Sequence, residues 1–298
     1  MKLNKTLMAA CACALAATTG SAFASFDRGS SHKSNHSHSD RCSTKGHDLV
    51  IAGVTTDSKL ICFQDDSPNR AKTIGSITGL ATDTKILGID YRPASGSDGD
   101  QGDLYALGDQ GGVYVIDQST AAATLKSRLD VALAGQSFGV DFNPVVDRLR
   151  VISDTGQNLR VNVDTGATLT DTPLTYPPAA AAATGAAYTN NDADPNTATT
   201  LFDIDPTLDQ VALQSPANSG QLAASGKLTV DTSSVVGSDI YSTVRNGTTV
   251  STKAFASLTV GGTSGLYRID LLQGKATARG LFSSGNAVTG IAIPLNQN

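Results

Sequence analysis

The amino-acid sequence predicts an all-β fold, a five-bladed β-propeller closed by a C-terminal strand that joins the first blade. The first observation is a repeat of roughly fifty residues, a period typical of stacked supersecondary units. The second is that all 27 acidic residues are Asp, which favours turns where Glu would favour helices. The third is that the expected strands fall into sets of four. In each repeat a glycine opens a short apolar strand, at Gly88-Ile89-Asp90, Gly139-Val140-Asp141, Gly185-Ala186-Ala187, Gly237-Ser238-Asp239 and Gly290-Ile291-Ala292.

The first element along the chain is a predicted secretory signal peptide over residues 1–24. Lys2 and Lys5 precede an apolar run, 7–17, that is too short to span a bilayer, and 22–24 (Ala-Phe-Ala) is a small-x-small cleavage site. The mature chain is therefore expected to begin at Ser25 and to be exported to the periplasm or the medium. No later stretch of the sequence is long and apolar enough to cross a membrane.

Residues 25–47 are predicted to be a disordered leader, because they are rich in Ser, His and Lys and lack apolar periodicity. The leader is interpreted either as a weak transition-metal tract or as a solvated linker, and the linker is the expected alternative. It contains every histidine of the chain: His32, His36, His38 and His47.

Two cysteines remain after cleavage of the signal, Cys42 in the leader and Cys62 in an expected strand. Disulfides persist in exported proteins, so we expect these two residues to be bridged. The bridge would fasten the leader to the first hairpin and would contribute about 3 kcal/mol on a chain-entropy argument. The alternative is a pair of free thiols.

Residues 48–298 are predicted to form a single β-propeller domain, in which turn residues such as those at 109–112 and 154–156 separate the strands. The first set has only three strands and the last strand stands alone, so 288–294 is expected to pair with 49–54. Such pairing closes the ring and removes exposed edges. The alternative is a β-sandwich or two stacked sheets. The expected strands are 49–54, 60–63 and 71–77; 86–91, 103–107, 112–116 and 123–128; 138–142, 149–152, 159–163 and 167–169; 185–188, 201–205, 210–213 and 221–228; 239–244, 254–260, 265–270 and 275–281; and 288–294.

The stretch 142–160, FNPVVDRLRVISDTGQNLR, resembles the hallmark segment of bacterial exported proteins grouped as domain-of-unknown-function family 4394. The segments AYTNN at 187–191, LTVGG at 258–262 and GLYRID at 265–270 fit the same family. The resemblance covers roughly residues 48–294. It implies β-propeller-like repeats and an exported location, and it implies no activity. The His-rich leader and the acidic insertion at 98–103 depart from the family pattern.

Composition excludes several chemistries within the predicted propeller. No histidine follows His47, so a Ser-His-Asp triad or a histidine-rich zinc or iron site cannot form there. Without Glu, a glycosidase carboxylate pair would need Asp as its acid, and a calcium-dependent lactonase site is disfavoured. The sequence has no phosphate-binding loop and no dinucleotide fingerprint. A net charge of −5 argues against nucleic-acid partners and anionic membranes.

Asp90, Asp141 and Asp239 occupy equivalent places in the expected innermost strands, where Ala187 and Ala292 fill the other two. Because such strands line the central channel, the three carboxylates are expected to converge. A divalent cation, Ca²⁺ or Mg²⁺, would satisfy them and is the expected cofactor if the protein holds one. The favoured alternative is that each Asp accepts backbone N–H bonds or pairs with an arginine.

Arg148 and Arg150 share one face of their strand. We expect them to form ion pairs with Asp141 and Asp90 between blades, because a guanidinium matches a carboxylate in two hydrogen bonds. The alternative is that they bind an anionic ligand at the channel mouth. A neighbouring polar turn and strand start would extend such a site, with Asp154, Gln157, Asn158 and Arg160.

The acidic stretch 98–103 resembles a calcium loop, with Asp98, Asp100 and Asp103 as candidate metal ligands, but it departs from the EF-hand pattern. It connects the first two strands of its blade, as do 190–195 and 245–247. Equivalent connections lie on one face of a propeller, where inserted loops often build the binding surface. Solvated acidic turns are the favoured alternative.

The sequence therefore favours an exported, non-catalytic propeller that binds a small ligand or another exported protein, as a monomer and without nucleic acid. The first alternative is a divalent-metal-dependent hydrolase or lyase that uses the channel Asp residues. A third class is a spacer in a surface or matrix.

Overall fold

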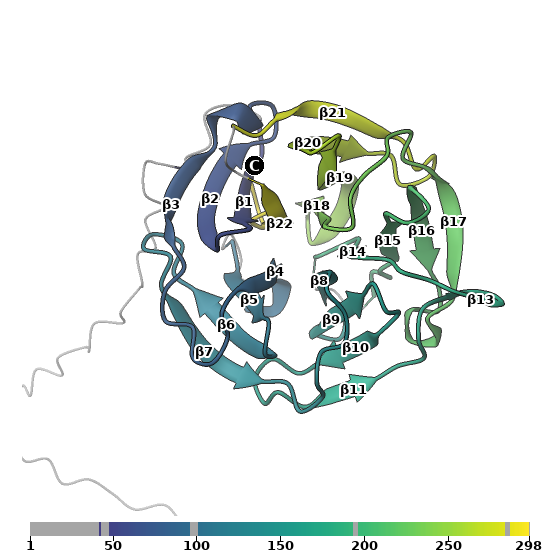
Figure 1. Ribbon diagram of the computed structural model, residues 1–298, viewed down its shortest axis with the longest axis horizontal. Coiled ribbons are helices and arrows are strands. Elements are labelled where there is room, and N and C mark those ends of the chain that lie inside the picture. Colours follow the sequence, from purple (N-terminus) through teal and green to yellow (C-terminus); the bar gives the residue numbers. More distant parts are fainter. Residues whose placement is uncertain (1–41, 43–47, 96–100, 193–195, 284–286, 298) are drawn as a thin grey trace, which may run out of the picture. The chain divides into compact units, whose positions relative to one another are not determined.

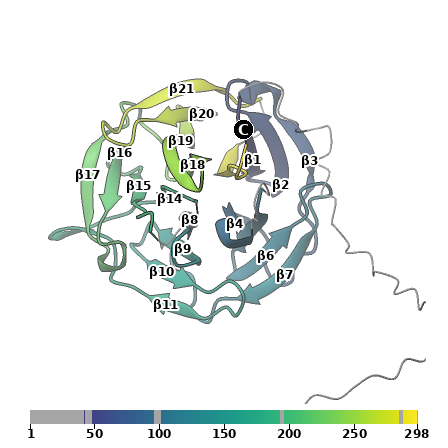
Figure 2. The same cartoon turned by 180° about the vertical axis from the view of Figure 1, so that it is seen from behind.

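A computed structural model of the chain describes residues 42, 48–95, 101–192, 196–283 and 287–297. In this part of the chain, five four-stranded sheets follow one another around a ring, which confirms the predicted five-bladed β-propeller (Figure 1). Figure 2 shows the same ring from behind. Each sheet is one blade, and its strands run antiparallel to their neighbours from the centre of the ring to the rim.

Every blade has four strands, ordered from the centre of the ring outwards. Blade 1 has β22 (Val288–Ala292), β1 (Val50–Thr55), β2 (Lys59–Gln64) and β3 (Lys72–Ser76); blade 2 has β4 (Ile86–Arg92), β5 (Asp103–Gly108), β6 (Gly112–Ile116) and β7 (Ala123–Arg128). Blade 3 has β8 (Phe138–Asn143), β9 (Arg148–Ser153), β10 (Asn158–Val161) and β11 (Thr168–Thr170). Blade 4 has β14 (Gly185–Tyr188), β15 (Leu201–Asp205), β16 (Gln210–Gln214) and β17 (Leu222–Lys227); blade 5 has β18 (Gly237–Arg245), β19 (Thr248–Val260), β20 (Thr263–Ile269) and β21 (Ala276–Leu281).

The C-terminal strand closes the ring as predicted. β22 pairs with β1, with Ala292 opposite Ala52 and Ile291 opposite Gly53. Beyond the strand, Gln297 fastens the C-terminal segment to β1. Its Oε1 accepts the N–H of Val50 at 2.7 Å, and its Nε2 donates to the Val50 carbonyl at 2.8 Å. Blade 1 is therefore assembled from both ends of the propeller.

The hydrophobic core is divided among the interfaces between blades. Five clusters of buried side chains each join one blade to the next. The sequence of β1 is apolar almost throughout because all six of its residues are buried. Ile51 packs in the cluster shared with blade 5, whereas Ala52 and Val54 pack in the cluster shared with blade 2. Most of the apolar area is thus buried between sheets, where each blade depends on both neighbours.

The structure adds elements that the sequence pattern does not predict. β12 (Thr175–Tyr176) and β13 (Ala179–Ala180) form a small separate hairpin between blades 3 and 4. Three short 3-10 helices, η1 (Pro68–Arg70), η2 (Pro93–Ser95) and η3 (Ala217–Ser219), lie in connections of the described residues. In the described part of the chain, no helix has the length and apolar character that a membrane span requires.

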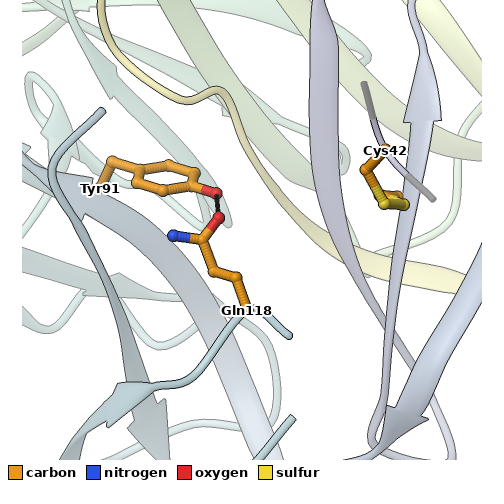
Figure 3. Close-up of a disulfide and its surroundings, with 4 residues drawn as sticks. Cys42, Tyr91 and Gln118 are labelled. Carbon is orange, nitrogen blue, oxygen red and sulfur yellow. Dashed lines mark hydrogen bonds between the residues drawn. A yellow bond between two sulfur atoms is a disulfide. The ribbon is translucent and has the colours of Figure 1, made fainter. Parts of the chain in front are cut away.

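Cys42 and Cys62 form the expected disulfide, with their Cα atoms 5.9 Å apart. Cys62 lies in β2, so the bridge fastens the end of the leader to blade 1 (Figure 3). Both cysteines line a small cavity of about 30 Å³ together with Tyr91 and Gln118 of blade 2. The four histidines of the leader lie outside the described residues.

Candidate functional site

The five innermost strands, β22, β4, β8, β14 and β18, surround the centre of the ring (Figure 1). Each begins on one face of the propeller, which we call the entry face, and ends on the opposite face, the exit face. The inner edge of each strand has no strand partner, so its backbone groups must find acceptors and donors around the central axis.

The repeated glycine explains how closely these strands converge. A Cβ added to Gly237 would lie 2.6 Å from the Cα of Gly290, and one added to Gly139 would lie 2.8 Å from the nitrogen of Ala186. At these two glycines the backbone of one inner strand closely approaches the backbone of the next, whereas Gly88 lies against the side chain of Val140. We call the narrowing the glycine waist, formed by Gly88, Gly139, Gly185, Gly237 and Gly290.

Two residues past the waist, toward the exit face, the three predicted aspartates come together. One carboxylate oxygen from each of Asp90, Asp141 and Asp239 lies within 4.8 Å of the other two. All three residues are buried, with exposed fractions of 7%, 4% and 5%. The sequence repeat thus placed this cluster, the channel triad, correctly.

The channel triad supplies acceptors to the neighbouring inner strands. Asp90 accepts the N–H of Phe142 in blade 3 at 2.6 Å. Asp141 accepts the N–H of Tyr188 in blade 4 at 3.0 Å. The same step recurs from Asp239 of blade 5 to blade 1, whose Ile293 N–H donates at 2.5 Å.

In blades 2 and 5 the acceptor comes from the same strand, because blades 1 and 4, which precede them, carry Ala292 and Ala187 in place of the aspartate. The N–H of Tyr91 donates to Asp90 of its own strand at 2.8 Å, and the N–H of Ile240 donates to Asp239 of its own strand at 2.5 Å. Three carboxylates therefore satisfy one inward-facing N–H from each of the five inner strands. Accepting these N–H groups, which would otherwise be buried without partners, is the clearest chemical role of the triad.

Burial dominates the electrostatics of the triad. Desolvation raises the pKa of Asp90 well above its usual range, with repulsion from Asp239 as the next cause. It also raises the pKa of Asp141, with repulsion from Asp90 and Asp239. Desolvation raises the pKa of Asp239 to about 7, although the N–H bonds of Ile293 and Ile240 oppose it. Without a cation, burial and mutual repulsion therefore favour the protonated forms of the triad.

The expected ion pairs between the triad and the arginines are not formed among the described residues. Arg150 instead lies between blades 3 and 4, with only 1% of its surface exposed. Its guanidinium donates to Asp171 and to Asn158, both at 2.7 Å, and to Asn218 at 2.8 Å. The physical reason is that the triad carboxylates are already engaged by backbone N–H groups, whereas Asp171 lies at the rim end of the interface.

The other residues of the expected anion site are also distributed away from the central axis. Arg160 pairs with Asp171 at 2.7 Å, and Arg148 donates to the carbonyl of Asp147 at 2.7 Å. Asn158 is buried beside Arg150, and Asp154 accepts the N–H of Gln136 at 2.9 Å. The structure does not bring these side chains together with the triad.

The candidate calcium loop is described only in part. Asp98 and Asp100 lie outside the described residues. Asp103 is the exposed first residue of β5, and its N–H donates to the Ser95 hydroxyl at 2.8 Å. The metal hypothesis for this loop stays a prediction.

Two features were missed by the sequence reasoning. Asp203 is fully buried in blade 4, and neither carboxylate oxygen has a hydrogen-bond partner. Burial raises its pKa well above the usual range, while attraction to Arg150 opposes the shift. Nothing in the alternation of β15 marks this Asp as buried, because exposed strand faces carry the same residue type.

The second missed feature is a cavity of about 150 Å³ at the centre of the entry face, which we call the mouth cavity. Most of its lining residues lie one to three positions before a repeated glycine, so the repeat itself could have located them. It is lined by Thr56, Lys85, Ile86, Leu87, Gln136, Ser137, Phe138, Val235, Val236 and Thr289.

A family model described as "Domain of unknown function (DUF4394)" matches residues 59–292. The protein therefore belongs to this family, as the resemblance of the segment 142–160 indicated. The family description assigns no activity. No curated protein matches the chain.

Several solved structures resemble the chain at low identity. A protein of unknown function from Bacteroides thetaiotaomicron is 14% identical with a TM-score of 0.40, over 78% of this chain and 58% of that one. A protein from Lactobacillus plantarum is 13% identical with a TM-score of 0.40, over 83% and 99%. An auxiliary nutrient binding protein from Bacteroides ovatus is 12% identical with a TM-score of 0.36, over 58% and 46%. The chain spans less than two thirds of the first and third proteins, and none of these likenesses carries an argument about function.

Proposed function

We propose that the protein is an exported, non-catalytic binding module that acts as a monomer and takes a small ligand or a protein partner at the centre of its ring. The observation that carries this proposal is the mouth cavity, a concave site of about 150 Å³ to which blades 1, 2, 3 and 5 contribute residues. Concave sites with mixed apolar and polar lining are the usual form of small-molecule sites. The signal peptide and the Cys42–Cys62 disulfide support export.

The use of the triad supports a binding role over catalysis. A catalytic acid or base must lie within hydrogen-bond reach of the substrate atom to or from which it transfers a proton. The channel triad is buried, and its carboxylates accept N–H groups from all five inner strands. Such carboxylates hold the inner strands together, and a substrate would have to displace those bonds.

The test is an unbiased ligand screen on the purified mature protein, residues 25–298, read as a shift of the thermal unfolding midpoint. A ligand at a hundredfold excess over its Kd should stabilise the native state by about 2.7 kcal/mol. A screen of small metabolites and exported proteins that shifts nothing would contradict the binding proposal.

The alternative proposal is a divalent-metal-dependent hydrolase or lyase. It draws support from the mutual approach of three buried carboxylates within 4.8 Å, a donor set that suits Ca²⁺ or Mg²⁺. The oxygens that accept N–H groups keep further lone pairs for a cation.

A chelator experiment separates the two proposals. If the triad holds a cation, added Ca²⁺ or Mg²⁺ should raise the unfolding midpoint relative to chelator, and Asp141→Asn should abolish the difference. Asp231→Asn, a change of an exposed aspartate, is the matched control. An identical midpoint with chelator and with each cation would remove the metal-enzyme alternative.

A further inference from the structure

We propose that the mouth cavity binds small monocarboxylates with a short apolar body, and that the Lys85 ammonium pairs with the carboxylate. This inference rests on the proposed binding function and names its ligand class. It is carried by three properties of the cavity, namely its charge, its lining and its closed floor.

The charge of the cavity is positive. Lys85 is the one charged residue of its lining, and in the described part of the chain its ammonium takes part in no salt bridge. The adjacent Asp109 accepts the N–H and the hydroxyl of Thr84 at 2.7 and 2.6 Å and the backbone N–H of Lys85 at 3.4 Å, without an ion pair to the Lys85 ammonium. Asp57, beside the lining residue Thr56, is paired with Lys59 at 2.6 Å. An anionic group entering the cavity therefore meets an ammonium group that has no salt-bridge partner among the described residues.

The rest of the lining combines an apolar wall with hydroxyl groups. Val235 keeps 37% of its surface exposed, and Leu87 is half-buried, so apolar surface is presented to the cavity. Ligand sites commonly use such a surface for the body of the ligand and a few polar groups for its orientation. The hydroxyls of Thr56 and Ser137 can donate to the second carboxylate oxygen, whereas the hydroxyl of Thr289 donates to the Val54 carbonyl at 3.3 Å.

The size of the ligand is set by the floor. The lining residues Leu87, Phe138, Val236 and Thr289 immediately precede the glycine waist, where the open space narrows to about 10 Å³, too little for a ligand to pass. The ligand must therefore enter and leave by the entry face. A volume of about 150 Å³ is about ten times what a buried water needs, which limits the ligand to about ten non-hydrogen atoms.

The test uses butyrate, hexanoate and benzoate, each against its own amide, titrated calorimetrically into the mature protein. We expect at least one carboxylate to bind about tenfold more tightly than its amide, since a hydrogen bond to a charged group contributes about 1.5–3 kcal/mol. Lys85→Gln should abolish the preference. Lys275→Gln, an exposed lysine in a turn on the exit face, should preserve it.

A second variant tests the location. Val235→Trp, at the exposed edge of the cavity, should block every probe, with an unfolding midpoint measured to show that the variant is folded. The proposal is overturned if no carboxylate binds at millimolar concentration, or if Lys85→Gln leaves the preference intact. Benzylamine and glucose are included in the panel. If either binds while the carboxylates do not, the binding function stands and the ligand class is wrong; if no compound binds in this panel or in the wider screen, both fail.

Discussion

At the residue scale, the channel triad takes the place of a missing sheet partner. The inner edge of each blade leaves an N–H facing the axis, and three carboxylates accept five of these groups in all. An N–H bond to an ionised carboxylate is stronger than one between neutral groups. Burial of three acidic groups side by side opposes ionisation and favours retained protons, so part of that extra strength is given up.

The retained protons predict how stability depends on pH. Because the folded pKa of Asp239 is raised to about 7, the native state binds a proton that the unfolded chain has already released above about pH 4. The stability that this proton contributes is therefore fully present below about pH 4 and is lost as pH rises toward 7, by up to about 1.4 kcal/mol per pH unit for each such proton. The raised pKa values of Asp90, Asp141 and Asp203 act in the same direction.

The measurement is the unfolding midpoint between pH 5 and pH 8, in the presence of chelator. We expect a decline in the wild-type protein and a shallower decline in Asp239→Asn. The variant also loses one acceptor, so its midpoint should be lower throughout and the slope is the readout. Asp231→Asn should keep the wild-type slope. An unchanged slope in Asp239→Asn would show that the triad is not the source.

Two arginines on one face of β9 should differ widely in their contribution to stability. Arg150 is buried with four side-chain partners, so Arg150→Met removes the guanidinium donor to Asn158, Asn218 and Tyr188 and leaves Asp171 with Arg160 as its remaining arginine partner. We expect a loss of about 3–5 kcal/mol in the free energy of unfolding. Arg148 donates only to backbone carbonyls, and Arg148→Met should cost about 0.5 kcal/mol or less. Denaturant unfolding measures both, and equal losses would contradict the buried network.

The residue scale also shows how far the sequence could predict the site. The three aspartates were predictable because a repeated position in equivalent strands faces the same axis. The partners of Arg150 were not, because Asp171 and Asn218 lie 21 and 68 residues away in irregular connections. Alternation put Arg148 and Arg150 on one face, and it could not tell which of them the next blade would cover.

At the scale of elements, strands buried on both faces were the easiest to predict. β1, β8 and β14 are short, largely apolar runs that each contain a glycine, and their positions matched expectation. The segment between blades 3 and 4 was harder, because prolines at 173, 177 and 178 and a run of alanines give no alternation. Its β12–β13 hairpin has two residues in each strand, too few to show an alternation in the sequence.

The glycine waist gives a prediction at this scale. Gly237→Ala would place a methyl group 2.6 Å from the Cα of Gly290 and 2.8 Å from the nitrogen of Ile291. Two inner strands would have to separate, and we expect a loss of about 1–3 kcal/mol or more, as for other overpacked cores. Gly75→Ala in the rim strand β3 is the control, since its nearest contact is 3.3 Å. Similar thermal midpoints for the two variants would argue against a backbone contact at the waist.

At the scale of the whole molecule, cooperativity should follow from the way the core is divided. Each blade shares its apolar clusters with both neighbours, so no blade has a core of its own. Removing one interface therefore exposes two sheet faces. At the junction between the chain ends, the part of such an interface that β22 contributes can be removed without altering any other residue.

Deletion of residues 288–298 should open the ring. β1 would lose its pairing with β22, Asp239 would lose the Ile293 N–H, and Gln297 would no longer bridge to Val50. An exposed inner edge also invites association between molecules. We expect a midpoint lower by more than about ten degrees, or loss of cooperative unfolding, together with increased light scattering.

Addition of a synthetic peptide covering residues 287–298 tests whether pairing is the cause. The peptide should restore a cooperative transition in proportion to its concentration, because it binds the native state and stabilises it by mass action. The same peptide with Ala292→Pro cannot donate the backbone bond to Ala52 opposite it, so it should restore nothing. If the truncated protein unfolds like the full chain, pairing of β22 with β1 contributes no stability. The remaining apolar clusters between neighbouring blades must then hold the ring together.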